Sequence, residues 1–156
     1  MDPFALAEPE RALLRELRRR GVRFVVIGMG AAVLQGATAS TQDLDLWFES
    51  PSDSRIGEAV RAAGGIYISS SFGMQPPTIG GDLGDRFDVV THAHGLGSFA
   101  DEWPATIETA IDGEPIRILR LERILASKRA VGRPKDLAQI PVLEAAIAVR
   151  DSSVEE

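Results

Sequence analysis

The chain has 156 residues, of which 44% are hydrophobic, and this suits one soluble domain with a buried core. The formal net charge of −6 argues against an extended nucleic-acid-binding surface, because such a surface needs many cationic contacts to phosphate. The absence of cysteine excludes disulfides, thiolate metal sites and a cysteine nucleophile. No apolar run reaches membrane-spanning length, and the start of the chain lacks the pattern of a secretion signal. We therefore expect a cytoplasmic protein with no membrane partner.

Helical and strand patterns alternate in the first half of the chain. Leucines at helical spacing predict a helix over Pro9–Arg20, which Gly21 ends. A β-branched run predicts a buried strand over Val22–Ile27. The patterns that follow predict, in order, a short helix over Gly28–Gly36, a polar connection over Ala37–Gln42, a strand over Asp43–Glu49, a helix over Asp53–Ala63 and a strand over Ile66–Ser70.

The second half is expected to begin with a loop and to end with two helices. Ser71–Gly84 is rich in Ser, Pro and Gly, which predicts a long loop. Asp112-Gly113 lies between two strand-like runs and is a strong hairpin signal. The predicted elements are a strand over Arg86–Thr91, hairpin strands over Thr106–Ile111 and Glu114–Leu119, and helices over Leu121–Val131 and Pro134–Val149, the last with Pro141 as a possible kink. We expect a single α/β (α+β) domain over residues 1–150, with a mixed sheet, flanking helices, a C-terminal helical pair, and a disordered tail over 151–156.

Three aspartates are the candidate metal ligands. Side chains alternate across a strand, so Asp43 and Asp45 should point to the same side, and Asp88 lies among apolar residues on another predicted strand. Carboxylates held close together repel one another unless a cation lies between them, and Mg²⁺ prefers oxygen ligands. The alternatives are a solvated strand face for the first two aspartates and a salt bridge to Arg86 for the third.

Two segments are candidates for phosphate binding. Gly28 and Gly30 open a predicted helix, whose N–H groups can receive a phosphate, although a tight strand-to-helix turn also explains them. Lys128 and Lys135 are the only lysines in a chain that otherwise uses arginine. Together with Arg133 they can clamp phosphate, and exposed cations near a helix end are the structural alternative.

Two histidines suggest a different metal. His92 and His94 would lie on one strand face if the strand that begins at Arg86 continued that far. Such a pair can ligate zinc. No third ligand of matching type is evident, so we do not expect a zinc site.

In their order along the chain, these motifs resemble the nucleotidyltransferase superfamily of the DNA polymerase beta type. The small bacterial nucleotidyltransferase-like proteins of abortive-infection and toxin–antitoxin systems are the most similar members. In them a strand enters a Gly-Gly or Gly-Ser turn, a Thr-x-Asp-hydrophobic-Asp strand follows, and a segment Ser-Lys-Arg-Ala-x-Gly-Arg-x-Lys-Asp-Leu comes late. The matching segments here are Val26–Ala31, Thr41–Leu46 and Ser127–Leu137, and the resemblance covers roughly Val22–Leu143.

The resemblance implies metal-dependent transfer of a nucleotidyl group from a nucleoside triphosphate (NTP) to a protein or an RNA end, with pyrophosphate leaving. It implies Mg²⁺ or Mn²⁺ bound by Asp43, Asp45 and Asp88, and Asp88 would also help to deprotonate the acceptor hydroxyl. Lys128 would offset the charge on the leaving pyrophosphate, and Asp136 would orient the neighbouring cations. The implied nucleotide-binding residues are Gly28, Gly30, Thr41, Lys128, Arg133, Lys135 and Asp136.

Three departures from the family pattern motivate a second hypothesis. Met29 stands where the family has a second Gly or a Ser, Ala39 stands where many relatives have Arg, and Gln139 stands where relatives often carry an acid. A thioether offers phosphate no donor, and its bulk would crowd the nucleotide. The second hypothesis is therefore a non-catalytic interaction module, antitoxin-like or regulatory, that binds a protein from a neighbouring gene.

Overall fold

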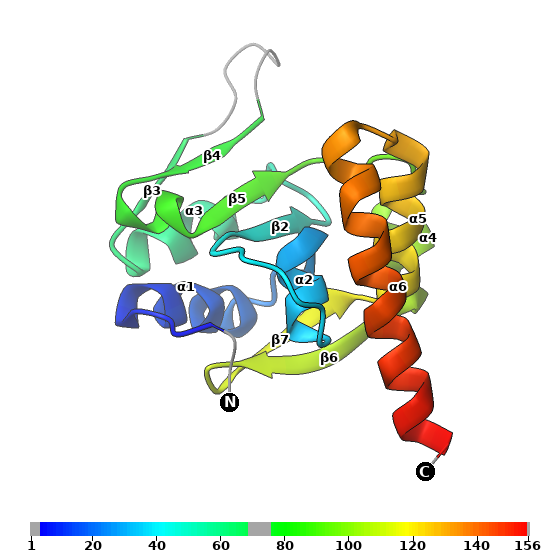
Figure 1. The fold of residues 1–156 in the computed structure, drawn as a ribbon. Helices are drawn as coiled ribbons and strands as arrows, with labels where there is room; N and C mark the ends of the chain where they lie inside the picture. Colours follow the sequence, from blue (N-terminus) through cyan, green and yellow to red (C-terminus); the bar gives the residue numbers. More distant parts are fainter. Residues whose placement is uncertain (1–3, 69–75, 156) are drawn as a thin grey trace.

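The computed structural model describes residues 4–68 and 76–155, which form helices, a five-stranded sheet and a small separate hairpin (Figure 1). In chain order the elements are α1 Glu8–Arg19, β1 Phe24–Ile27, α2 Gly28–Leu34, β2 Leu44–Phe48, α3 Ser54–Ala62, β3 Ile66–Ile68, β4 Thr78–Gly80, the 3₁₀ turn η2 Asp82–Asp85, β5 Phe87–Val90, α4 Phe99–Glu102, the 3₁₀ turn η3 Trp103–Ala105, β6 Thr106–Ile111, β7 Glu114–Leu119, α5 Leu121–Val131 and α6 Pro134–Glu155.

The large sheet is mixed, as the sequence predicts. Its strand order is β5-β2-β1-β7-β6. β1 runs antiparallel to β2 and parallel to β7, while β2 runs parallel to β5. β6 and β7 form the expected hairpin, in which Asp112 and Gly113 both take positive φ, as a two-residue primed turn requires.

The helices form two groups around this sheet (Figure 1). α1 packs against α3 and β7, and its leucines Leu13, Leu14 and Leu17 are fully buried. α2 packs against β1 and β2 and also contacts α5, which in turn packs along α6. The strand residues Leu44, Leu46 and Ile118 complete the core between these layers. α5 and α6 are the C-terminal helical pair expected from the sequence.

The register of the central strands decides which side chains are neighbours. Asp45 is the partner of Ile27 on β1 and of Asp88 on β5. Trp47, two residues further along β2, is the partner of Val25 and Val90. Because side chains alternate across a strand, Asp45, Asp88 and Trp47 lie on one face of the sheet.

Part of the predicted loop over Ser71–Gly84 is wrong. Thr78–Gly80 is β4, which pairs with β3, and η2 begins at Asp82, whereas residues 69–75 lie outside the described part of the chain. α4 and η3 were also not predicted. Such short elements depend on contacts with distant segments, which a local sequence pattern does not contain.

The end of the chain is also more regular than predicted. α6 does not stop at Val149 but continues to Glu155, so the expected disordered tail is helical up to that residue. The helix continues through Pro141. Although α6 is 22 residues long, no helix in the described part of the chain combines the length and apolarity needed to cross a membrane.

Candidate active site

Asp45 and Asp88 lie side by side on neighbouring parallel strands. They are register partners of β2 and β5, with Asp45 half-buried and Asp88 exposed. Asp43 is exposed and comes just before β2, which begins at Leu44 and not at Asp43 as predicted. Its charge still acts on the two other carboxyl groups. The predicted aspartates are therefore neighbours in space.

Gly28 allows the Asp45 carboxylate to lie against the start of α2. Gly28 has a φ of +74°, and a Cβ atom there would lie 2.5 Å from Asp45 Oδ2. Any other residue would force the carboxylate to move. The glycine is therefore explained by close approach of a side chain as well as by its left-handed backbone.

Gly30 and Met29 have structural roles. A Cβ atom on Gly30 would lie 2.7 Å from the Asp43 carbonyl oxygen, so Gly30 lets α2 pack closely against the start of β2. The Met29 side chain belongs to the hydrophobic core. Met29 is buried and does not line the cavity described below, so the structure gives no support to the expectation that it crowds a nucleotide there.

The three carboxylates make ionisation of Asp45 costly. Burial first, and then the charges of Asp88 and Asp43, raise the pKa of Asp45 to about 6, and Lys128 opposes this shift. The pKa of Asp88 is also raised, by burial and by Asp43. A salt bridge between Asp88 and Arg86 does not form, since Arg86 pairs with Glu10 at 3.4 Å. A bound cation would relieve this repulsion.

Cationic groups come from the end of α5 and the start of α6, where they share one buried carboxylate. Asp136 is fully buried and accepts hydrogen bonds from the Arg133 backbone N–H at 3.2 Å and from Arg133 Nε at 2.7 Å. Lys128 Nζ lies 3.4 Å from the other Asp136 oxygen. These contacts, with Arg133 first, lower the pKa of Asp136 to about 2. Gly132 ends α5 in a left-handed conformation and turns Arg133 back toward Asp136.

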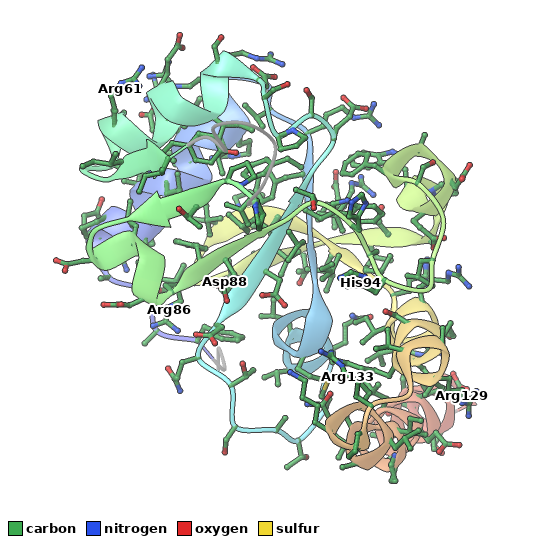
Figure 2. All side chains as sticks on the ribbon, turned by 90° about the horizontal axis from the view of Figure 1, so that it is seen from above. Arg61, Arg86, Asp88, His94, Arg129 and Arg133 are labelled. Carbon is green, nitrogen blue, oxygen red and sulfur yellow. The ribbon has the colours of Figure 1, made fainter. Side chains whose placement is uncertain are left out.

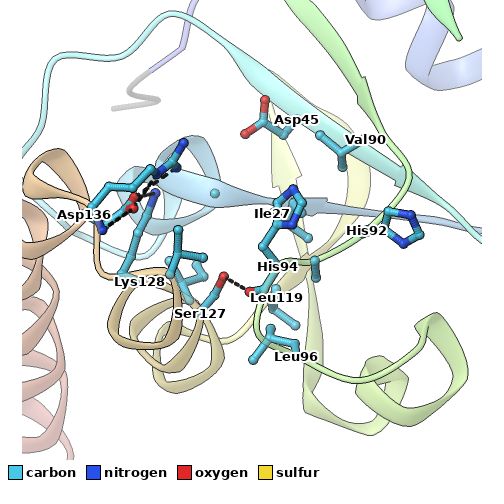
Figure 3. A pocket seen from close by; sticks show the side chains of 15 residues that line it. Ile27, Asp45, Val90, His92, His94, Leu96, Leu119, Ser127, Lys128 and Asp136 are labelled. Atoms are coloured by element: carbon cyan, nitrogen blue, oxygen red, sulfur yellow. Dashed lines mark hydrogen bonds and ion pairs between the residues drawn. The ribbon is translucent and has the colours of Figure 1, made fainter. Parts of the chain in front are cut away.

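Asp45 lines one cavity of about 150 Å³ together with Lys128, Arg133 and Asp136 (Figure 3). Its charged and polar lining includes Asp45, His92, His94, Ser127, Lys128, Arg133 and Asp136. Gly28 and Ile27 also contribute to the wall, at the end of β1. Figure 2 shows Arg133 between α2 and the helical pair, whereas Arg129 lies on the outer side. The cavity thus joins the sheet to α5 and α6.

Other predicted site residues lie outside this cavity. Asp43 and Asp88 are beside Asp45 but do not line the cavity. Thr41 accepts a hydrogen bond from the Asp43 N–H at 3.4 Å, which shapes the approach to β2. Lys135 is exposed on α6 and does not line the cavity either. Of the two lysines, only Lys128 reaches the cavity.

Residues 91–98 form a wall of the cavity that sequence reasoning did not assign to it. β5 ends at Val90, so His92 and His94 lie beyond the strand, with ring centroids 6.4 Å apart. The Ser127 hydroxyl donates to the His94 carbonyl at 2.5 Å. The His-x-His pattern is the sequence signal for this wall, although by itself the pattern suggests a zinc site.

The donor set around Asp45 fits a hard divalent cation. Asp43, Asp45 and Asp88 offer only carboxylate oxygens, their charges repel one another, and two of them are register partners. Across residues 4–68 and 76–155, however, no group of three or more His, Cys, Asp or Glu side chains is already arranged to hold a metal ion. The exposed carboxylates of Asp43 and Asp88 would have to turn toward Asp45, and the metal site stays a prediction.

Neither a protein-family model nor a curated protein matches this sequence. Solved structures, however, are similar to this chain in fold. The crystal structure of ANT(2″)-Ia in complex with adenylyl-2″-tobramycin has a TM-score of 0.57 and 17% identity, over 92% of this chain and 90% of that one. The solution structure of the antibiotic-resistance factor ANT(2″)-Ia has a TM-score of 0.55 and 18% identity, over 94% and 93%.

An antigenic nucleotidyltransferase-like protein from Paracoccidioides brasiliensis is a further structural neighbour. Its TM-score is 0.54 at 16% identity, over 94% of this chain and 78% of that one. These identities are too low to transfer an activity, but the similarity extends over nearly the whole chain. The chain therefore has the nucleotidyltransferase fold.

Proposed function

We propose that this protein is a nucleotidyltransferase that moves a nucleoside monophosphate group from an NTP to an acceptor hydroxyl. The observation that carries this proposal is the joint placement of Asp45 with Lys128 and Arg133 around one cavity beside Gly28. Carboxylates for metal ions and cations for phosphate are the two groups that this reaction needs. They come from segments more than 80 residues apart.

We propose Mg²⁺, or Mn²⁺, as the metal, with Asp43, Asp45 and Asp88 as its ligands. When bound, the metal would neutralise phosphate charge and stabilise the attacking and leaving oxygens. The acceptor oxygen forms a bond to the α-phosphorus. The bond between the α-phosphorus and the oxygen that bridges to the β-phosphorus breaks, and pyrophosphate leaves. Asp88 is exposed next to Asp45 and takes the proton of the acceptor hydroxyl.

Lys128 and Arg133 offset the charge that develops on the leaving pyrophosphate. Lys128 supplies a point charge from a side chain that is only 18% exposed, and Arg133 supplies a planar fork at the cavity wall. Asp136 holds both cations and is itself fully buried, so it orients them without needing to touch the nucleotide. Gly28 keeps the space beside Asp45 open.

For the acceptor we propose a protein side chain or an RNA end. The net charge of −6 suits a local contact better than a long duplex. The complex of ANT(2″)-Ia with adenylyl-2″-tobramycin makes an aminoglycoside a further acceptor to include in the test. A phage-defence or toxin–antitoxin setting stays a prediction of the sequence resemblance.

The alternative, a non-catalytic module, is motivated by Met29, Ala39 and Gln139. Met29 is buried in the core and does not line the cavity. Ala39 is exposed in the connection before β2, and Gln139 lies on α6, and neither lines the cavity. Because none of the three residues lines the cavity, we retain the enzyme hypothesis.

The test has a binding part and a transfer part. Each of the four NTPs is titrated into the protein by calorimetry with and without Mg²⁺, and α-labelled NTPs are incubated with protein, RNA and aminoglycoside acceptors. We expect Mg²⁺-dependent binding of at least one NTP, weakened at least tenfold in Asp45→Asn. Asp85→Asn, which removes an exposed acid from η2, is the matched control and should bind as the wild type does. Absence of Mg²⁺-dependent binding, or equal binding by the wild type and Asp45→Asn, would overturn the proposal.

A further inference from the structure

The segment that carries His94 is fixed to α5 by two contacts. The His94 backbone carbonyl accepts a hydrogen bond from the Ser127 hydroxyl at 2.5 Å. The next residue, Gly95, has a φ of +78°, and a Cβ atom there would lie 2.4 Å from Ala130 Cβ. Because Lys128 directly follows Ser127, the same turn of α5 positions His94 and the principal cation of the cavity.

The His94 ring is available for a ligand. The residue is exposed and lines the cavity, and its imidazole has no hydrogen-bond partner in the described part of the chain. Figure 3 shows the ring on the opposite side of the cavity from Lys128 and Asp136. His92 also lines the cavity but extends toward a second one, which Trp47 and Phe99 line. The two histidines are therefore not equivalent.

His94 can supply a hydrogen-bond donor on its own side of the cavity. Lys128 and Arg133 both lie on the opposite wall, where the carboxylate of Asp136 neutralises part of their charge. Asp45 adds a negative charge above them. A triphosphate in this space could accept a hydrogen bond from the side of His94 as well as from the side of the two cations. An imidazole carries at least one N–H donor in either protonation state.

We propose that His94 is a nucleotide-contacting residue, which donates an imidazole N–H to a non-bridging oxygen of the triphosphate from the wall opposite Lys128. This inference rests on the proposed function, and it adds a contact that the family motifs do not include. A hydrogen bond to a charged oxygen changes an affinity by about tenfold or more. The contact exists in the bound substrate, so its loss raises KM for the NTP and leaves kcat within about twofold.

The experiment uses tripolyphosphate with Mg²⁺ as the calorimetric probe, because it has the phosphates without base or ribose. His94→Phe keeps a ring but has no donor, and we expect it to weaken binding about tenfold. His94→Asn keeps an N–H donor and should stay within about threefold of the wild type. The loss of affinity for tripolyphosphate in His94→Phe should also be at least fivefold greater than the loss in His92→Phe. Circular dichroism of each variant confirms that it is folded.

The outcomes separate this inference from the proposed function. Failure of the wild type to bind tripolyphosphate and every NTP with Mg²⁺ overturns the proposed function. Binding by the wild type, together with equal binding by His94→Phe, overturns the role of His94 alone. Equal losses in His94→Phe and His94→Asn, or in His94→Phe and His92→Phe, also overturn it, because the effect would then not depend on a donor at this position.

Discussion

Asp45 illustrates how a carboxylate of the candidate site can lower the stability of the protein that carries it. Its carboxyl group is half-buried beside two other aspartates, and its pKa is raised to about 6 from an ordinary value of 3.8. The unfolded chain, where the group is solvated, ionises it at a lower pH. Ionisation of Asp45 therefore opposes folding at neutral pH in the absence of metal.

Asp45→Asn should stabilise the metal-free protein in a pH-dependent way. The folded pKa is raised, so the stability penalty is absent below about pH 4, grows as the pH rises to about 6, and is constant above that. We expect a gain of about 1 to 3 kcal/mol at pH 7.5. Urea unfolding at pH 4 and pH 7.5, with a chelator present, measures it. A stability gain of the same size at both pH values would show that ionisation of Asp45 is not its cause.

Gly28→Ala should affect nucleotide binding more than stability. Its left-handed φ costs an alanine about 1 to 2 kcal/mol. The new Cβ atom meets only the end of the Asp45 side chain, which can rotate away and leave the site. Gly36→Ala is the control, since Gly36 also has positive φ but nothing lies within 4 Å of its Cβ position. Both variants should lose similar free energy of unfolding, and only Gly28→Ala should lose Mg²⁺·NTP binding.

At the scale of elements, the segment that contains the cavity wall is attached at several places. Glu102 of α4 is 5% exposed, accepts the Gly97 N–H at 3.0 Å and pairs with Arg123 of α5 at 2.6 Å. The guanidinium groups of Arg23 and Arg117 each lie over the Trp103 ring, at 4.1 and 4.7 Å from its centroid. These contacts hold residues 91–105 on the sheet and against α5.

Arg123→Met should be costly because it leaves Glu102 buried without its cation. We expect the free energy of unfolding to fall by about 1.5 to 3 kcal/mol, which is the range for a buried charged group that loses its hydrogen-bond partner. Arg129→Met on the same helix is the control, because Arg129 pairs at 3.4 Å with Glu144 and both side chains are more than half exposed. That pair should contribute less than about 0.5 kcal/mol. Chemical unfolding of both variants distinguishes the two cases, and equal losses would contradict the role of burial.

At the scale of the whole molecule, the cavity exists only where the sheet and the helical pair meet. The sheet supplies Asp45 and the end of β1, α5 supplies Lys128, and the turn between α5 and α6 supplies Arg133. Asp136 is the connection within the helical pair, since it binds one cation from α5 and one from the turn before α6. Its ionisation therefore stabilises the arrangement of the whole cationic wall.

Asp136→Asn should lower the thermal midpoint and weaken Mg²⁺·NTP binding together. The folded pKa of Asp136 is lowered to about 2, so its stabilisation is complete above the unfolded value of 3.8 and disappears as the pH falls toward 2. The difference in urea midpoint between the wild type and Asp136→Asn should thus be constant above about pH 5 and shrink below pH 4. A difference that does not depend on pH in this range would contradict this role.

The sequence alone predicted most of the regular structure. Local signals were sufficient for the β6–β7 hairpin, where Asp112-Gly113 must adopt positive φ, and for α1, whose leucines repeat at helical spacing. The alternation of Leu44, Leu46 and Asp45 likewise predicted which side of β2 carries the acid. These features depend on neighbours only a few residues away, so the order of residues determines them.

Only the tertiary structure decided which of the predicted residues meet. The pairing of β4 with β3 and the burial of Met29 depend on segments that are distant in the sequence. The contact of Gly28 with Asp45 and the position of His94 opposite Lys128 likewise arise from strand register and helix docking. Lys128 and Lys135 have the same chemistry in the sequence, yet the helical turn at Gly132 places only Lys128 at the cavity. Periodicity gives each side chain a direction on its own element, and packing between elements decides what it faces.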